Sequence, residues 1–102
     1  MQVRCTHHID ASEPDADGDY EYYYEFNIFA FEEGELTLKA RSYSDESTRV
    51  SLMGLEQTGK QRTLEYKDLK RPLVQQAIDH LRSIGKTEVR WFNPKYARYE
   101  PV

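Results

Sequence analysis

The chain has 102 residues, of which 38% are hydrophobic and 31% charged, and its formal net charge is −4. No run of about eighteen apolar residues is present, which excludes a membrane-spanning helix. The first eight residues lack the apolar segment of a signal peptide, and the single cysteine excludes an internal disulfide. We therefore expect one domain over residues 1–102, with one modest core and a cytoplasmic location.

The charges are unevenly distributed along the chain. Ten Asp and Glu residues and no Lys or Arg lie between Cys5 and Leu38, whereas thirteen Lys and Arg residues follow from Lys39 onward, against eight acids. The simpler interpretation is that acidic strands pair with basic strands within the fold. The alternative is a surface with two poles that attracts a charged partner.

The first predicted element is a short strand, because Val3, Cys5, His7 and Ile9 alternate with polar residues. Residues 10–19 have no apolar periodicity and are rich in Asp and Glu, so they are predicted to form a mobile acidic loop.

Residues 20–31 give the strongest strand pattern in the chain. Tyr and other apolar residues occupy the even positions from Tyr20 to Ala30, and the odd positions mix acids with aromatic residues. A second strand is predicted over residues 35–43, with its apolar residues also at even positions. A three-residue loop, residues 32–34, would place Ile28 opposite Leu38 and Glu25 opposite Arg41, with Gly34 in the left-handed position.

A third strand is predicted over residues 48–56, with a bulge near Gly54 where the apolar phase shifts. Residues 57–60 form a turn, and residues 62–66 a short strand. Turn loops of two and of three residues both give a tolerable pairing between these strands, so that register stays open.

A helix is predicted from Pro72 to Ile84, because apolar residues recur there at helical spacing. Pro72 suits the first helical position and Gly85 the C-terminal cap. A last strand follows over residues 87–92, and residues 93–102 form a basic, aromatic tail. The fold class is therefore α+β: a two-layer sandwich of a mostly antiparallel sheet, about five to six strands in the order β-β-β-β-β-α-β, with one helix on one face.

No metal, cofactor or catalytic site is predicted. Residues 15–19 superficially resemble a calcium loop, but Tyr20 and Phe26 occupy the positions where an EF-hand needs Gly and Glu. Cys5 and His7 share a strand face, but two ligands do not make a structural zinc site. No nucleophile elbow and no phosphate-binding loop is present, so we predict that the protein is not an enzyme.

The remaining hypothesis is a protein that binds another protein or a second copy of itself. One helix covers only one sheet face, and we expect it to cover the even positions of residues 20–31. The predicted binding surface is then the opposite face, formed by Tyr23, Phe29, Phe31 and Tyr43. A competing possibility is that the N-terminal strand or the tail folds over this face and makes these residues core.

Two other functions are weighed as alternatives. One is an acidic inhibitor that imitates nucleic acid, for which the long acidic stretch is the motive. The other is weak nucleic-acid binding by the tail, through Lys95, Arg98 and two tyrosines. Nucleic acid is a less favoured partner for the sheet, because Glu21 and Glu25 on the mixed face would repel phosphate.

Overall fold

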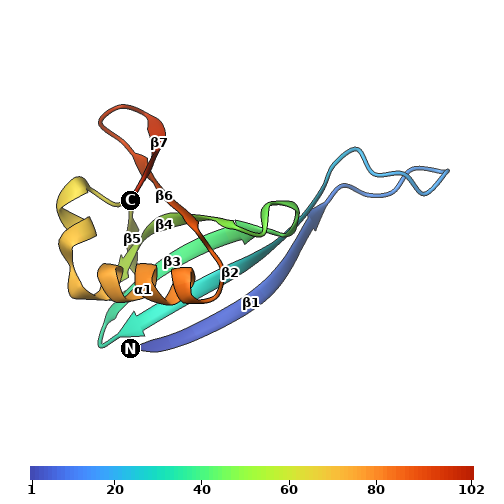
Figure 1. The fold of residues 1–102 in the computed structure, drawn as a ribbon. Coiled ribbons are helices and arrows are strands. Elements are labelled where there is room, and N and C mark those ends of the chain that lie inside the picture. The colour runs from blue at the N-terminus through green and yellow to red at the C-terminus, as the bar shows by residue number, and fades with distance from the viewer.

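The computed structural model describes all 102 residues as an α+β fold, with a mostly antiparallel seven-stranded sheet and one α-helix (Figure 1). The strands are β1 (Gln2–Ala11), β2 (Tyr23–Glu33), β3 (Leu36–Tyr43), β4 (Arg49–Gln57), β5 (Lys60–Arg62), β6 (Glu88–Asn93) and β7 (Arg98–Pro101). The helix is α1 (Pro72–Ser83), and two short 3-10 helices are η1 (Ser44–Glu46) and η2 (Tyr66–Lys70). No helix is long and apolar enough to cross a bilayer.

The strand order is β1-β2-β3-β4-β6-β7, and β5 pairs with the second half of β4. All neighbours are antiparallel except β4 and β6, which are parallel and are connected through α1. The predicted strand count and order need correction in two places. The segment predicted as a tail contains β7, and the strand predicted over residues 62–66 is the shorter β5, followed by η2.

The register predicted for the β2–β3 hairpin is wrong. The loop has two residues, Gly34 and Glu35, and Ile28 lies opposite Arg41 instead of Leu38. Gly34 has a φ of 59°, which suits the first central position of a type II′ turn. The sequence pattern gave the wrong register because β2 carries large apolar residues at both odd-numbered and even-numbered positions. The observed register matches the bulkier pair, Phe29 and Phe31, with the apolar side of β3.

The helix consequently packs on the opposite sheet face from the one predicted. Its apolar stripe contacts the side of β2 that carries the odd-numbered residues. On that side Phe31 is fully buried and Phe29 is nearly so. The helix itself agrees with its prediction: Pro72 opens it, and Gly85 follows it with a φ of 95°. The core cluster has fifteen members, which are Phe29, Phe31, Leu38, Ala40, Val50, Leu52, Leu55, Leu64, Leu73, Val74, Ala77, Ile78, Leu81, Val89 and Trp91.

The bulge predicted near Gly54 is confirmed. Lys39 lies opposite Gly54 and Ala40 opposite Leu52, which leaves Met53 as the extra residue of β4. The β4–β5 turn has two residues, and Gln57 pairs with Lys60, which decides between the two open registers. Gly54 is required here, since a Cβ at this position would lie 2.5 Å from the Arg62 carbonyl oxygen.

A long hairpin projects from the body of the molecule (Figure 1). We call residues 9–24 the arm; it comprises the end of β1, the connecting loop and the start of β2. The radius of gyration is 15.1 Å, above the ~13 Å typical of a compact domain of this length. The base of the loop is closed by contacts within the arm: the Ser12 hydroxyl accepts hydrogen bonds from the backbone N–H groups of Glu21 and Tyr22 at 2.8 and 3.3 Å. No core residue lies in the arm.

Candidate functional site

A continuous series of aromatic rings lies on the sheet face opposite α1, which we call the outer face. We call this series the aromatic row; in spatial order it consists of Tyr22, Tyr24, Tyr43, Phe26 and His8. Neighbouring ring centroids are 5.4–6.1 Å apart, within the range of favourable aromatic contacts. The row begins on the arm and ends on the body, so that it joins the two parts of the molecule.

Arg41 is the cation of this surface. Its guanidinium carbon lies 5.0 Å from the centroid of Tyr43 and 5.9 Å from that of Phe26, which is cation–π geometry. No acidic side chain forms an ion pair with Arg41, and its Nε is buried without a hydrogen-bond partner. The observed register explains this position, because Arg41 faces Ile28 and therefore lies on the outer face with the even residues of β2.

A second cation–aromatic group lies at the other end of the sheet. The Arg90 guanidinium stacks 4.6 Å from the centroid of Tyr99, whose ring contacts Phe92 at 5.4 Å. Arg90 also donates a hydrogen bond from Nε to the Ser51 hydroxyl at 2.9 Å. The tail predicted to be basic and aromatic is therefore partly folded into β7.

The four residues predicted to form the binding surface do not share one face. Phe29 and Phe31 are core residues beneath α1. Tyr43 lies in the aromatic row on the outer face, whereas Tyr23 lies on the helix side of the arm. Tyr23 donates a hydrogen bond to Glu25 at 3.4 Å, and its pKa is raised by desolvation and by the Glu25 carboxylate.

The sequence analysis missed the β2 residues of the aromatic row, because it placed the even-numbered residues of this strand in the core. Tyr22 and Tyr24 are 44% and 53% exposed, and Phe26 is half-buried. The signal that identifies them is the register of the hairpin. Once Leu38 is placed opposite Phe31, the even residues of β2 must face away from the helix.

The acids of the arm are not paired with cations. The arm contains six Asp and Glu residues and no Lys, Arg or His, and none of the six takes part in an ion pair. Further along the acidic half, Glu32 pairs with Arg4 at 2.8 Å and Glu25 approaches His7 at 3.6 Å. Internal pairing therefore accounts for only some of the acids on the body, since Glu33 and Glu35 form no ion pair, and it leaves the arm strongly negative.

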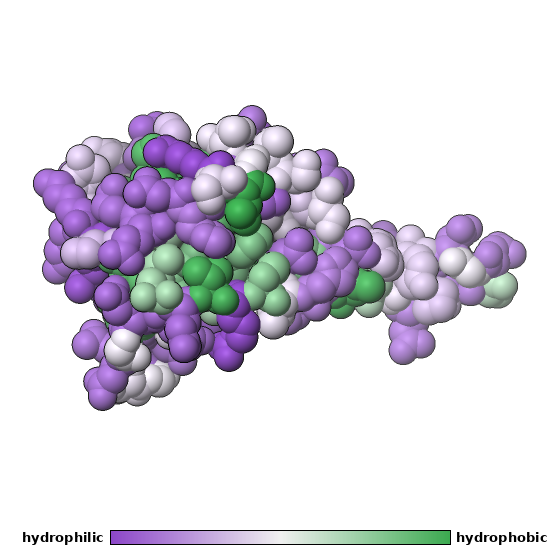
Figure 2. Space-filling model, turned by 60° about the horizontal axis from the view of Figure 1, so that its bottom comes forward, coloured by the Kyte–Doolittle hydropathy of each residue, from purple (hydrophilic) through white to green (hydrophobic).

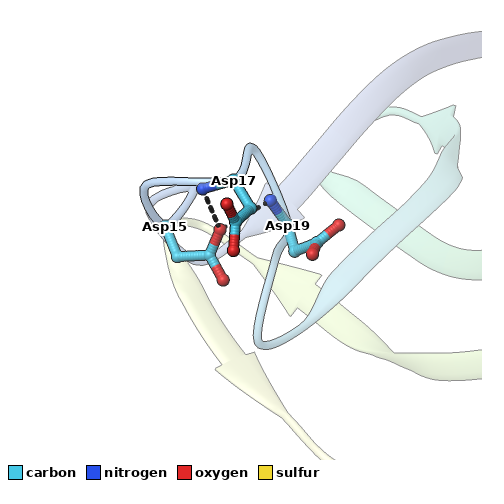
Figure 3. A group of neighbouring side chains, drawn as sticks. All are labelled: Asp15, Asp17 and Asp19. Carbon is cyan, nitrogen blue, oxygen red and sulfur yellow. Dashed lines mark hydrogen bonds between the residues drawn. The ribbon is translucent and has the colours of Figure 1, made fainter.

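Three arm acids form a cluster at the loop (Figure 3). One carboxylate oxygen from each of Asp15, Asp17 and Asp19 lies within 4.8 Å of the others, and all three residues are exposed. Asp15 Oδ1 accepts hydrogen bonds from the backbone N–H groups of Asp17 and Asp19, both at 2.9 Å. This carboxylate thus stabilises the turn, and the cluster is explained as a feature of the loop.

The single cysteine and the three histidines of the chain do not converge on one site. Cys5 is exposed on β1, and the His7 ring contacts Asn27 through Nδ1 at 3.0 Å. His8 points to the other face and stacks on Phe26. His80 lies on α1 with its ring edge toward Phe31 at 5.7 Å.

The largest surface depression has a volume of about 640 Å³ and lies between η2 and the β6–β7 turn, with Tyr66 and Tyr96 among its lining residues. The most perturbed acid, Asp68, does not line it. The Asp68 pKa is held far below its usual range, primarily by hydrogen bonds from Arg62. This carboxylate is committed to a structural network and is not placed to act on a ligand.

No protein-family model, curated protein sequence or solved structure matches this chain.

Proposed function

We propose that this chain is a non-enzymatic protein-binding module, in which a two-layer body holds the arm and the aromatic row for docking onto a basic surface of another protein. The observation that carries the proposal is the continuity of the aromatic row from the body, where Phe26 and Tyr43 are half-buried, onto the arm, where Tyr22 and Tyr24 are exposed. Exposed aromatic clusters typically mark interaction sites, because Tyr supplies a large contact area together with a polar group.

The arm is poorly explained as a structural element of the monomer. A two-stranded ribbon without a core beneath it is marginally stable in water. Four tyrosines on the arm nevertheless remain exposed, and these are Tyr20, Tyr22, Tyr23 and Tyr24. Docking would bury these rings and order the ribbon further.

The charge of the arm indicates the chemistry of the partner. Six unpaired acids on sixteen residues produce a local negative potential, whereas the rest of the chain has fourteen Lys and Arg residues against twelve acids. Such a potential speeds association with a positive surface and weakens as salt screens it. If that positive surface is itself a nucleic-acid-binding site, the arm would act as the acidic imitator considered above.

The test is capture of partners by the intact chain, compared with two matched double variants. Tyr22→Ser/Tyr24→Ser removes the arm half of the aromatic row. Tyr66→Ser/Tyr96→Ser removes two tyrosines that are at least as exposed and that line the depression between η2 and the β6–β7 turn. We expect a protein that is retained by the wild type and by the second variant, is lost with the first, and is released by moderate salt. Equal retention by all three chains would contradict the proposal, and release by added DNA would identify the imitator.

Nucleic-acid binding is a second candidate, favoured by one specific observation. Arg41 and Arg90 lie on the outer face beside aromatic rings and have no acidic partners. Bases stack on such aromatic and guanidinium surfaces in single-strand-binding sheets. Anisotropy of a labelled single strand should then rise with the wild-type chain, and Arg41→Gln should lower the affinity. No rise at low salt would remove this candidate.

A further inference from the structure

The outer edge of β1 is a long, unpaired edge of the sheet. β1 pairs only with β2, through an uninterrupted register from Gln2 to Ala11. Natural edge strands are typically short or protected by Pro, charged side chains or a bulge. β1 has ten residues without Pro, Lys or a bulge, and its only charged side chains apart from histidine are Arg4 and Asp10. The other end of the sheet has such protection, because β7 has four residues and contains Pro101.

The helix-facing side of β1 adds apolar surface to this edge. Val3 and Ile9 are 39% and 56% exposed, and Cys5 between them is exposed as well. Although β1 lies beside the core residues of β2, no residue of β1 is buried. Figure 2 brings the side of the molecule on which β1 lies toward the viewer and shows hydrophobic surface surrounded by hydrophilic residues.

We propose that β1 is a self-association edge, on which β1 of a second copy pairs antiparallel about a two-fold axis at His7. This edge shares only His8 with the aromatic row. Two-fold pairing at His7 places Arg4 opposite Asp10 of the second copy and Cys5 opposite its Ile9. It therefore creates two opposite-charge pairs and extends apolar contacts on the helix side.

The pairing of opposite charges favours the His7-centred register over the neighbouring register centred at Thr6. A two-fold axis at Thr6 would place Arg4 opposite His8 and Asp10 opposite Gln2, so that no opposite-charge pair forms. In the His7-centred register, Asp10, which has no cation in the monomer, lies opposite Arg4 of the second copy, whose guanidinium also pairs with Glu32 of its own chain. Because the two strands are antiparallel, the arms of the two copies point in opposite directions, and their residues beyond Ala11 lie outside the paired edge.

Disulfide trapping tests the register directly. In a Cys5→Ser background, His7→Cys would place the two thiols opposite each other, with Cα atoms about 4.5–5.5 Å apart, which suits a disulfide. Thr6→Cys is the matched control, because its two thiols would be offset with Cα atoms about 8 Å apart. We expect mild oxidation to give a dimer with His7→Cys and little with Thr6→Cys. The reverse result, or no dimer from either, overturns the proposal.

Charge exchange supplies a second test that needs no new bond. Arg4→Asp and Asp10→Arg each replace two attractive pairs by two repulsive ones, so each variant alone should self-associate about tenfold more weakly. Mixing the two variants restores both opposite-charge pairs, and the mixture should form a heterodimer in sedimentation equilibrium. A wild-type chain that is still monomeric at ~1 mM overturns the proposal, as does a mixture no tighter than its components.

Discussion

Replacing Asp68 with Asn is expected to destabilise the fold substantially, because its carboxylate connects three segments. The side chain is completely buried in η2. It accepts hydrogen bonds from Arg62 Nη1 at 2.6 Å and Nη2 at 2.8 Å, from Arg71 Nε at 2.9 Å, and from the Glu65 backbone N–H at 2.8 Å. The network therefore fixes the end of β5 and the start of α1 to η2.

The size of the expected loss in unfolding free energy follows from the hydrogen bonds that Asn cannot accept at this position. Its amide group supplies one acceptor oxygen and turns an N–H donor toward the arginines. Removing one partner of a buried ion pair costs about 3–5 kcal/mol. Because the side chains of Arg62 and Arg71 are 44% and 43% exposed, water partly solvates their charges. We therefore expect Asp68→Asn to lower the free energy of unfolding by about 3 kcal/mol.

The direction in which pH changes the stability contributed by Asp68 can also be predicted. Folding lowers the Asp68 pKa below its unfolded value of about 3.9. The stabilisation is therefore complete above that unfolded pKa and is lost as pH falls through the folded pKa. Urea unfolding at pH 7 and at several values below 4 should show the wild type converging on the variant as pH decreases. A difference below 1 kcal/mol at pH 7, or one that does not shrink in acid, would refute the reasoning.

Four further predictions concern the core, a close backbone contact and the arm. Leu81→Ala should cost about 2–5 kcal/mol as a fully buried truncation, whereas the half-exposed Ile84→Ala should cost under about 1 kcal/mol in the same urea titration. Gly54→Ala should cost about 1–3 kcal/mol in thermal unfolding, because its Cβ would displace the backbone of Arg62; an unchanged melting temperature would contradict the close contact. Phe29→Lys should unfold the chain, as seen by loss of near-ultraviolet circular dichroism, since it introduces a charge into the core. Calcium or zinc should leave the melting temperature unchanged, and a saturable rise with either ion would show that the arm cluster or the β1 residues hold it.

Sequence patterns predicted the elements whose two sides differ clearly. The helix was located by its apolar stripe and by Pro72 and Gly85. β6 was located because Val89 and Trp91 alternate with polar residues, and both are buried. The bulge was located by the shift in apolar phase near Gly54, and its extra residue is Met53.

The candidate site could not be predicted because β2 has no polar side. The local sequence pattern fits two core pairs equally well: Phe29 and Phe31 on one face of β2, or Phe26 and Ile28 on the other. A shift in hairpin register exchanges these two faces. The choice depends on β3 and α1, which are distant in sequence, and on Arg41, whose long side chain can lie over aromatic rings on an exposed face. β7 was missed because four residues containing a proline give too short a pattern.

The parallel pairing of β4 with β6 determines when the core can close during folding. The β1–β4 meander and the β4–β5 hairpin form from neighbouring segments, but β6 joins β4 only after η2 and α1 have crossed between them. Trp91 is the single tryptophan of the chain, lies on β6 and is 1% exposed. Trp91 lies outside the β1–β4 meander and the β4–β5 hairpin, so its fluorescence reports the closure of β6 onto the core and not the formation of those hairpins. Loops of this length close more slowly than local turns. Stopped-flow refolding followed by Trp91 emission should consequently lag behind the far-ultraviolet signal of the strands.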